Sequence, residues 1–472
     1  MTVTANLSGN APMLDDLRWD SDLIDRYDLS GQRYTSYPTA IQFHTQIGAF
    51  DLLHALRTSR IAKRPLSLYV HIPFCANICY YCACNKVITK DRGRAQLYLQ
   101  RLQQEIELLA CHVDPGQVVE QLHFGGGTPT FLSHAELRQL MAHLRRHFTL
   151  LDDDTGDYSI EIDPREADWS TMGLLRELGF NRVSLGVQDL DPEVQRAVNR
   201  LQSRHQTQAI IDAARTLQFR SVNIDLIYGL PRQTPEGFAR TVNDIIELQP
   251  DRLSVFNYAH LPERFMPQRR IDGADLPTPE DKLRMLQRSI EQLTGAGYRY
   301  IGMDHFALPD DDLAIAQEEA SLHRNFQGYT THGHCDLIGL GVSAISQIGD
   351  LYTQNSNDLS DYQSQLASNQ LATKRGLRCN ADDRLRGAII GQLICNFSLD
   401  FPAVERSFSI VVQDYFADVW PRLLIMAEDG LLNIDARGIQ VTPAGRLLIR
   451  AICGVFDAYL NVSHRQLFSR VI

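Results

Sequence analysis

The residues best suited to chemistry are three cysteines within eight positions: Cys75, Cys79 and Cys82, in the string HIPFCANICYYCACNK. Three thiolates this close together can hold one [4Fe-4S] cluster and leave one of its irons without a protein ligand. That open iron can bind the amino and carboxylate groups of S-adenosylmethionine. An electron from the reduced cluster then splits the cofactor and yields a 5′-deoxyadenosyl radical, which takes hydrogen from unactivated carbon.

Two other interpretations of the clustered cysteines have to be weighed. A structural zinc site usually takes two CxxC pairs far apart, and the sequence has no second pair. Cys84 lies two residues after Cys82 and could be a fourth ligand, but its ligation would close the open iron. We therefore expect Cys84 to have a functional role outside the ligand set.

The remaining cysteines are isolated, and we expect them to be ordinary buried thiols: Cys111, Cys335, Cys379, Cys395 and Cys453. The string HGHC, residues 332–335, places two histidines beside one of them. A loop of this composition is more often solvated than metal-bound, so we expect no second metal there.

Six short runs rich in branched and aromatic residues alternate with helical stretches, as in a parallel sheet with crossover helices. The runs are 66–74, 118–124, 157–163, 182–188, 221–230 and 252–258. The first helical stretch has one apolar stripe, Leu99, Leu102, Ile106 and Leu109. The pattern predicts an α/β fold with a partial (β/α)6 barrel of the TIM type.

Residues with chemical potential recur where these runs end. They are Cys75, Gly125 to Thr128, Glu161, Gln188 and Asp225. The loops after barrel strands converge on one mouth, so we expect a common site there. The glycines permit close approach of a cofactor to the backbone, and no lysine follows them as in a P-loop. The two carboxylates could accept hydrogen bonds from ribose hydroxyls or face a sulfonium.

Length and charge bound the remaining possibilities. A chain of 472 residues usually has more than one core, and a net charge of −11 argues against a broad basic surface for nucleic acid. No signal peptide and no run of 18 apolar residues is present. We therefore expect a cytoplasmic protein that binds neither nucleic acid nor membrane.

Beyond Leu377 helical patterns dominate. Near the end, a helix, a strand pair turning at 435–438 and another helix are typical of a winged helix. Without a basic recognition helix, a packing or lid role is favoured over DNA binding. We expect an irregular N-terminal arm (1–45), the barrel with its extension (46–375) and a mainly helical, winged-helix-like C-terminal domain (376–472).

The cysteine loop, GGGTPT, IEIDPRE, LGVQD and NIDLIYGLP occur in this order, and together they resemble the radical S-adenosylmethionine family of bacterial oxygen-independent coproporphyrinogen III oxidases. Further strings extend the resemblance over nearly the whole chain, from RYTSYPTA at Arg33 through LHRNFQGYTT and GVSAISQIGD to the C-terminal FSRVI. The resemblance implies one [4Fe-4S] cluster on Cys75, Cys79 and Cys82, and two S-adenosylmethionine molecules.

The resemblance also assigns residues to the two cofactor molecules. Those for the cluster-bound molecule are Tyr69, Tyr81, Gly126, Glu161 and Ile345. Those for the second molecule are Gly127, Thr128, Gln188, Arg200, Asp225 and Ala259. The family also uses Phe at position 81, so the aromatic face is kept. No side chain is assigned a catalytic role of its own.

The reaction implied by the resemblance converts two propionates of coproporphyrinogen III into vinyl groups, giving protoporphyrinogen IX and carbon dioxide in heme biosynthesis. A monomer would receive electrons from a donor such as flavodoxin or ferredoxin. Arginines near the mouth would bind the anionic substrate.

Two alternatives share parts of this pattern. A heme chaperone would have the same barrel and cluster but would not decarboxylate a substrate. Cys84 in CACNK and the string RYTSYPTA favour the oxidase over the chaperone. A zinc-stabilised interaction protein would require the glycine and carboxylate motifs to be coincidental.

Overall fold

The computed structural model describes residues 17–28 and 31–460. The first sixteen residues of the predicted arm and the FSRVI string therefore lie outside the described residues. Within the described part, no helix combines the length and the apolar character that crossing a membrane requires.

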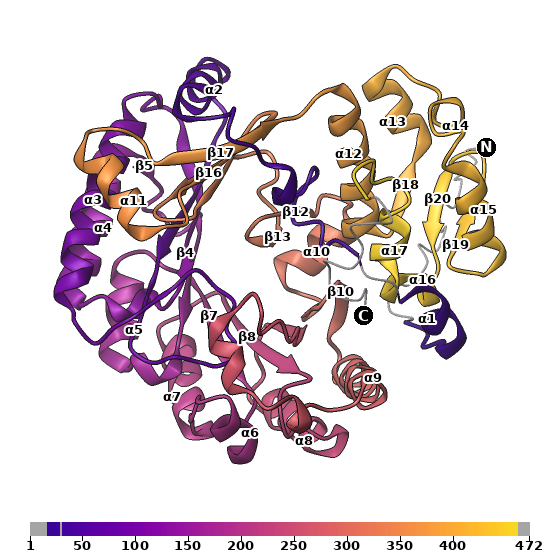
Figure 1. The fold of residues 1–472 in the computed structure, drawn as a ribbon, viewed down its shortest axis with the longest axis horizontal. Helices are drawn as coiled ribbons and strands as arrows, with labels where there is room; N and C mark the ends of the chain where they lie inside the picture. The colour runs from indigo at the N-terminus through magenta and orange to yellow at the C-terminus, as the bar shows by residue number, and fades with distance from the viewer. Residues whose placement is uncertain (1–16, 29–30, 461–472) are drawn as a thin grey trace, which may run out of the picture.

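A mixed sheet of thirteen strands forms the centre of the larger half of the molecule (Figure 1). Seven strands are parallel, in the spatial order β14 (Asp336–Leu340), β1 (Leu66–Ile72), β4 (Val118–Gly126), β6 (Asp157–Ile162), β7 (Arg182–Gln188), β8 (Ser221–Tyr228) and β9 (Arg252–Asn257). Six of them match the six predicted runs, and this confirms the partial barrel. The seventh, β14, comes from later in the chain and pairs with the outer side of β1.

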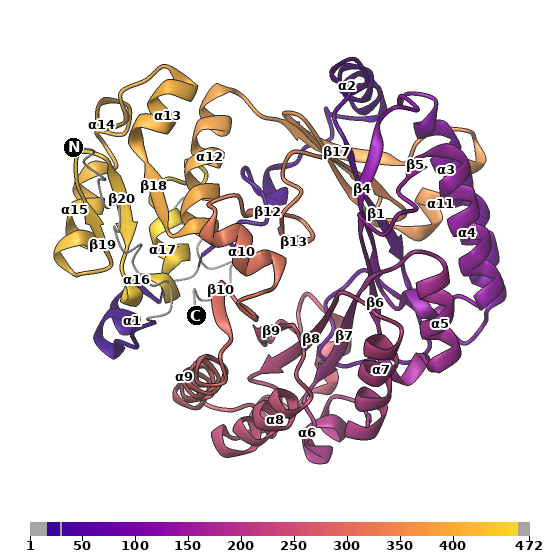
Figure 2. The ribbon, with the colours of Figure 1, turned by 180° about the vertical axis from the view of Figure 1, so that it is seen from behind.

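Helices connect the parallel strands and cover the outside of the sheet, as Figures 1 and 2 show. They are α3 (Gly93–Ala110), α4 (His134–His147), α5 (Trp169–Glu177), α6 (Pro192–Ala197), α7 (Arg204–Thr216) and α8 (Pro235–Glu247). The predicted stripe of α3 is buried, with no member more than 4% exposed. Helix α4 begins at a capping box, in which Ser133 and Glu136 satisfy each other's backbone N–H groups.

Antiparallel strands extend both edges of the parallel sheet. Beyond β14 lie β15 (Ile345–Ile348), β16 (Leu351–Asn355) and β17 (Thr373–Arg378), and beyond β9 lie β11 (His305–Ala307) and β10 (Arg299–Gly302). Short β5 (Thr149–Leu150) pairs with β4. The elements that flank these strands are α2 (Ala49–Ala62), α9 (Pro279–Gly295), α10 (Asp312–Glu318), α11 (Leu359–Ala367), β12 (His323–Asn325) and β13 (Gly328–Thr330).

The C-terminal part is mainly helical, as predicted. It contains α12 (Ala381–Asn396), α13 (Phe401–Phe408), α14 (Val412–Tyr415), α15 (Trp420–Glu428), α16 (Pro443–Leu447) and α17 (Ile449–Cys453). A small sheet in the order β18 (Ser398–Asp400), β20 (Gly438–Val441) and β19 (Leu432–Ile434) packs among them. The sequence α15, β19, β20, α16 is the predicted helix, strand pair and helix.

The N-terminal arm differs from the prediction because it is not irregular throughout. It contains α1 (Ser21–Tyr27), capped by the Asp20 side chain, and a short 3-10 helix, η1 (Ala40–Gln42). Helix α1 lies against the C-terminal part (Figure 1), where the Tyr27 hydroxyl donates to Asp429 Oδ2 at 2.5 Å. Its seven residues would be marginal as an isolated helix, so this packing supports it.

Candidate active site at the carboxyl ends of the strands

The cysteine loop begins on a two-stranded extension of the barrel mouth. Cys75 ends β2 (Phe74–Cys75), which pairs in parallel with β3 (Val87–Ile88) on the far side of the loop. The end of α6 holds the middle of the loop, because Asn199 Nδ2 donates to the Ile78 carbonyl at 2.7 Å. The loop is therefore attached to the barrel at its base and at its tip.

The glycine segment after β4 packs directly against the start of the cysteine loop. The Gly127 N–H donates to the Ile72 carbonyl, and the Thr128 N–H to that of Phe74, both at 2.8 Å. A Cβ atom on Gly127 would lie 2.7 Å from the carbonyl carbon of Pro73, so no side chain fits there. Thr128 also donates its hydroxyl to Cys75 Sγ at 3.5 Å.

A cavity of about 310 Å³ opens beside this junction. The three cysteines and Cys84 line it, together with eight of the predicted cofactor residues: Tyr81, Gly126, Gly127, Thr128, Glu161, Gln188, Arg200 and Asp225. These residues come from the ends of β4, β6 and β7, from the middle of β8, from the segment after α6 and from the cysteine loop itself. The convergence expected at the barrel mouth is therefore present.

The other three predicted residues do not line the cavity. Tyr69 lies on β1 and its ring stacks on His123, with ring centroids 5.8 Å apart. Ile345 begins β15, and its backbone packs against Gly339, the register partner of Tyr69. Ala259 offers its carbonyl to Gln268. None of the three is among the residues that line the cavity.

Gln268 nevertheless connects Ala259 to the cavity. Its side-chain amide donates to the Ala259 carbonyl at 3.2 Å and to the Tyr81 carbonyl at 3.0 Å. Gln268 belongs to the short helix η4 (Met266–Arg270) and is buried. Sequence reasoning missed it, since it has no motif and lies far along the chain from the cysteines.

Positive groups surround the sulfurs. Arg200 Nη1 lies 3.4 Å and Arg165 Nη2 3.7 Å from Cys79 Sγ. A hydrogen bond from Cys84 and the ammonium of Lys86, opposed by burial, lower the pKa of Cys82 to about 6. Burial raises the pKa of Cys75 to about 11. Donors directed at thiolate sulfurs fit a ligand set for an iron-sulfur cluster.

Asp163 holds both of these arginines. Arg200 Nη1 lies 3.0 Å and Arg165 Nη2 2.7 Å from Asp163 Oδ2. Burial raises the pKa of Asp163, but the two guanidinium groups outweigh it and the net pKa lies below the usual range. Sequence reasoning named Arg200 alone. Asp163 and Arg165 were visible in the string IEIDPRE, directly after Glu161 at the end of β6.

Two carboxylates in the cavity have opposite environments. Burial raises the pKa of Glu161, but His123 Nε2 at 3.3 Å and the Gly126 N–H at 3.1 Å bring it below the usual range. Burial, with the nearby charge of Glu161, raises the pKa of Asp225 to about 6. Glu161 is thus ready to accept hydrogen bonds or face a cation, whereas Asp225 gains most from a ligand that donates to it.

Gln188 adds an acceptor without a partner. Its Oε1 atom is buried and has no hydrogen bond among the described residues. The residue adopts a φ of +72° at the bulge that ends β7, which turns its side chain toward the cavity wall. A buried acceptor of this kind fits a polar cofactor with hydrogen-bond donors.

Two observations refine the cysteine predictions. Cys111 is exposed rather than buried, because it follows the last turn of α3, and Cys335 is only partly buried, whereas Cys379, Cys395 and Cys453 are buried as predicted. A larger cavity, of about 1240 Å³, lies between α12 and the arm, and none of the loop cysteines lines it. The cysteine chemistry therefore belongs to the smaller cavity.

Comparison with known proteins gives two family models. The Radical SAM superfamily matches residues 69–245, and the HemN C-terminal domain matches residues 379–448. Radical SAM proteins bind a [4Fe-4S] cluster and S-adenosylmethionine, and the residues of the smaller cavity fit both groups.

Similar proteins match over nearly the full chain. Oxygen-independent coproporphyrinogen III oxidase from Pseudomonas aeruginosa is 71% identical, covering 98% of this chain and 100% of the relative. The Escherichia coli enzyme of the same name is 52% identical, over 96% and 98% of the two chains. A solved structure described as coproporphyrinogen III oxidase (HemN) from Escherichia coli, a radical SAM enzyme, superposes with a TM-score of 0.90 at 51% identity, over 94% of this chain and 100% of that one. The chain belongs to the family of oxygen-independent coproporphyrinogen III oxidases.

Proposed function

We propose that this protein converts two propionate side chains of coproporphyrinogen III into vinyl groups without oxygen, giving protoporphyrinogen IX and carbon dioxide in heme biosynthesis. The observation that carries the proposal is the meeting of three cysteines with residues of four barrel strands in one cavity. Membership of the family identifies the substrate, and the residues that line the cavity are candidates for binding both cofactors.

In this proposal Cys75, Cys79 and Cys82 hold the cluster. When bound there, the cluster and S-adenosylmethionine would supply radical chemistry able to take a hydrogen atom from the propionate carbon next to the ring. Arg165 and Arg200 stabilise the thiolate of Cys79, and Asp163 fixes both arginines in place.

We propose two S-adenosylmethionine sites. The residues of the cluster-bound molecule are Tyr69, Tyr81, Gly126, Glu161 and Ile345, and those of the second are Gly127, Thr128, Gln188, Arg200, Asp225 and Ala259. The opposite pKa shifts of Glu161 and Asp225 support two binding environments in one cavity. Tyr69, Ile345 and Ala259 would act through the backbone or through the residues in front of them.

The remaining assignments complete the proposal. The chain would act as a cytoplasmic monomer, with an arm (1–45), a barrel with its extension (46–375) and a helical domain (376–472). A flavodoxin or ferredoxin would deliver the electrons. Lys86 and Arg165 line the cavity, and the positive charge there suits a substrate that carries four carboxylates.

The test is an anaerobic assay with reductant, S-adenosylmethionine and coproporphyrinogen III deuterated on the propionate carbons next to the ring. We expect protoporphyrinogen IX, methionine and deuterium in the 5′-deoxyadenosine. Cofactor cleavage alone would not suffice, because an open cluster also cleaves it unproductively. Tight heme binding without vinyl product or deuterium transfer would replace this proposal with the heme chaperone.

A further inference from the structure

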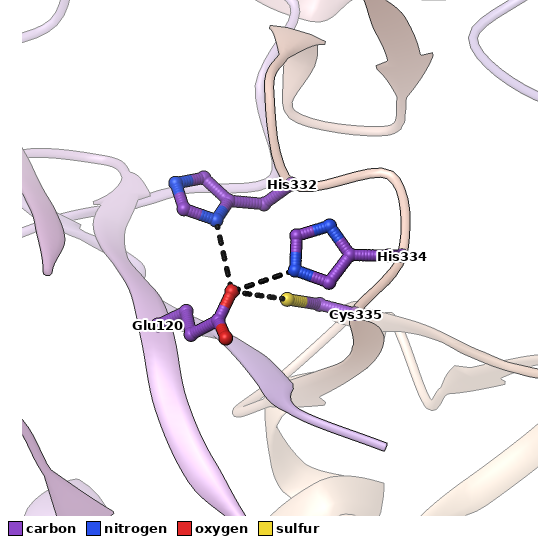
Figure 3. A group of neighbouring side chains, drawn as sticks. All are labelled: Glu120, His332, His334 and Cys335. Carbon is purple, nitrogen blue, oxygen red and sulfur yellow. Dashed lines mark hydrogen bonds and ion pairs between the residues drawn. The ribbon is translucent and has the colours of Figure 1, made fainter. Parts of the chain in front are cut away.

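A second cluster of possible metal ligands lies at the opposite end of the barrel strands. It consists of Glu120, His332, His334 and Cys335, whose ligand atoms all lie within 4.8 Å of one another (Figure 3). Glu120 is the third residue of β4, and Gly126 at the other end of that strand lines the active-site cavity. Six residues of strand separate them by about 20 Å, so the two sites are distinct.

The Glu120 carboxylate is the centre of this cluster. Its Oε2 atom lies 2.7 Å from His334 Nε2, 3.5 Å from His332 Nδ1 and 3.6 Å from Cys335 Sγ. Figure 3 shows both rings and the thiol directed at this oxygen. In tetrahedral zinc sites with such ligands, the ligand atoms lie about 3.3 to 3.7 Å apart. Two of the three distances match this range, and the third needs to lengthen by several tenths of an ångström.

The fold positions both halves of the cluster. The ladder between β1 and β4 pairs Leu66 with Val119 and Ser67 with Gln121, which makes Glu120 the extra residue of a bulge. Bulges of this kind redirect a side chain. Residues 331–335 connect β13 to β14, and β1 lies between β14 and β4 in the sheet. The connection thus crosses the end of β1 to reach Glu120.

Hydrogen bonds hold this connection in place. Gln121 Nε2 donates to Thr330 Oγ1 at 3.1 Å, and the His332 N–H donates to the same oxygen at 3.0 Å. The Cys335 N–H then donates to the His332 carbonyl at 3.1 Å, closing a turn that directs both side chains to one side.

His332 has the environment of a metal-bound imidazole. Its Nδ1 atom is buried and makes no hydrogen bond in the described chain, although the Glu120 carboxylate lies 3.5 Å away. Its other nitrogen, Nε2, lies 3.8 Å from Asp157 Oδ2, and that carboxylate also lies 2.9 Å from Arg182 Nε. This carboxylate is too far away for a direct hydrogen bond, but it places a negative charge behind the distal nitrogen, as is common behind metal-bound imidazoles.

We propose that Glu120, His332, His334 and Cys335 bind one Zn²⁺ ion in a closed, structural site. One thiolate, two imidazoles and one carboxylate are ligands that zinc takes in tetrahedral sites, and four protein ligands leave no position for a reacting molecule. Cys335 releases its thiol proton to solvent when the Zn–S bond forms. The ion joins the start of β14 to the start of β4 across β1, the strand that leads into the cysteine loop.

A second histidine cluster provides an internal control. Glu107, His143 and His147 lie on the outer surfaces of α3 and α4, and His143 Nε2 is 3.6 Å from Glu107 Oε1. This cluster offers three ligands, and 56% of the Glu107 side chain is exposed. It represents the weak surface binding that any zinc experiment has to exclude.

The experiment uses the full chain with its iron-sulfur cluster. The protein is treated with a chelator, given one equivalent of Zn²⁺ and desalted without oxygen. Elemental analysis counts the zinc, and X-ray absorption at the zinc edge identifies its neighbours without interference from iron. We expect one zinc per chain bound to one sulfur and three lighter atoms, and a higher melting temperature than without zinc.

Variants assign the ligands. Cys335→Ser should remove the sulfur neighbour, and His334→Ala should weaken zinc binding at least about tenfold. His334 is 57% exposed, so its loss leaves the fold intact even if Glu120→Gln does not. Two control variants should keep the zinc and its sulfur neighbour. One replaces Cys75, Cys79 and Cys82 by Ala, and the other combines His143→Ala with His147→Ala.

Three results would overturn the proposal. One is less than about a tenth of an equivalent of retained zinc in the wild type. The second is equal zinc affinity in wild type and His334→Ala, together with an unchanged sulfur neighbour in Cys335→Ser. The third is iron beyond the cluster's own at these four residues, with zinc unable to replace it.

Discussion

The two ends of the barrel strands hold clusters of similar ligands in opposite designs. At the carboxyl ends, which we call the open end, three cysteines come from one continuous loop, and in the proposed function they leave the fourth position of a cluster for a cofactor. At the amino ends, which we call the closed end, the four proposed zinc ligands come from a strand and a distant connection, and their ligand atoms lie within 4.8 Å of one another. The comparison teaches that the number of protein ligands, more than their identity, separates a reactive centre from a structural one.

The largest expected effect is at the open end. Cys75→Ala, Cys79→Ala or Cys82→Ala should each abolish the cluster and all vinyl formation, because two thiolates cannot replace three. Iron and sulfide analysis after anaerobic reconstitution measures this. Cys111→Ser, at an exposed cysteine, is the matched control and should keep full iron content. Unchanged iron in all three alanine variants would remove the assignment.

The next effect tests whether the open end holds two cofactor molecules. Asp225→Ala removes a buried acceptor and should weaken the second S-adenosylmethionine about 10- to 100-fold, the value of one charge-assisted hydrogen bond. The cluster-bound molecule should stay in place. Equilibrium binding to reconstituted protein gives the number of sites, and a single site unaffected by the substitution would contradict the prediction.

A buried carboxylate just beyond the carboxyl end of β14 should respond to pH. Glu105 accepts from the Gly341 N–H at 2.7 Å, just beyond β14, the strand that begins beside the proposed zinc. Tyr362 and Asn355 also donate to it. Burial outweighs these bonds and raises the pKa of Glu105 to about 7.

This folded pKa is above that of an unfolded glutamate, so the stability it contributes is complete below about pH 4.5 and is lost as the pH rises through about 7. The loss of this contribution lowers the free energy of unfolding by about 3 kcal/mol. Urea unfolding at about pH 5 and about pH 8 should show a smaller difference for Glu105→Gln than for the wild type. Equal differences in both proteins would refute this.

The smallest effect concerns whether the open end is really open. Cys84 lines the cavity beside Cys82 and is exposed. If it were a fourth ligand, the carboxyl end would be closed like the amino end. Cys84→Ala should keep most of the iron, whereas vinyl formation, assayed separately, is expected to fall. Complete loss of the cluster would show that Cys84 is a ligand.

Much of the open end could be predicted because its signals are local. Apolar residues that repeat every 2 positions in a strand or every 3.6 in a helix can be recognised within a short stretch of sequence, and so can three cysteines in one loop. The order of parallel strands then brings the ends of these stretches together. The sequence alone therefore predicts that Glu161, Gln188 and Asp225 share one site, and all three line the cavity.

The closed end could not be predicted, for a physical reason. Its ligands meet only because a bulge redirects Glu120 and because β14 pairs with the outer side of β1, next to β4. Neither the bulge nor that pairing has a sequence signal. For this reason HGHC alone favours a solvated loop. Contacts between residues far apart in the sequence also explain two other differences. The sequence does not show that Arg200 pairs with Asp163, or that α1 is held by distant residues.

The contacts of the arm also order the assembly of the protein in time. Tyr34 donates to Asp457 at 3.1 Å, and the Ala458 N–H donates to the Tyr37 hydroxyl at 2.9 Å. A ribosome that adds roughly 5 to 20 residues per second makes these partners about 20 to 80 s apart. During that interval the barrel strands and the cysteine loop have already emerged, while the arm waits for the last helices. Cluster insertion therefore has time to precede the docking of the arm, which needs residues 457 and 458.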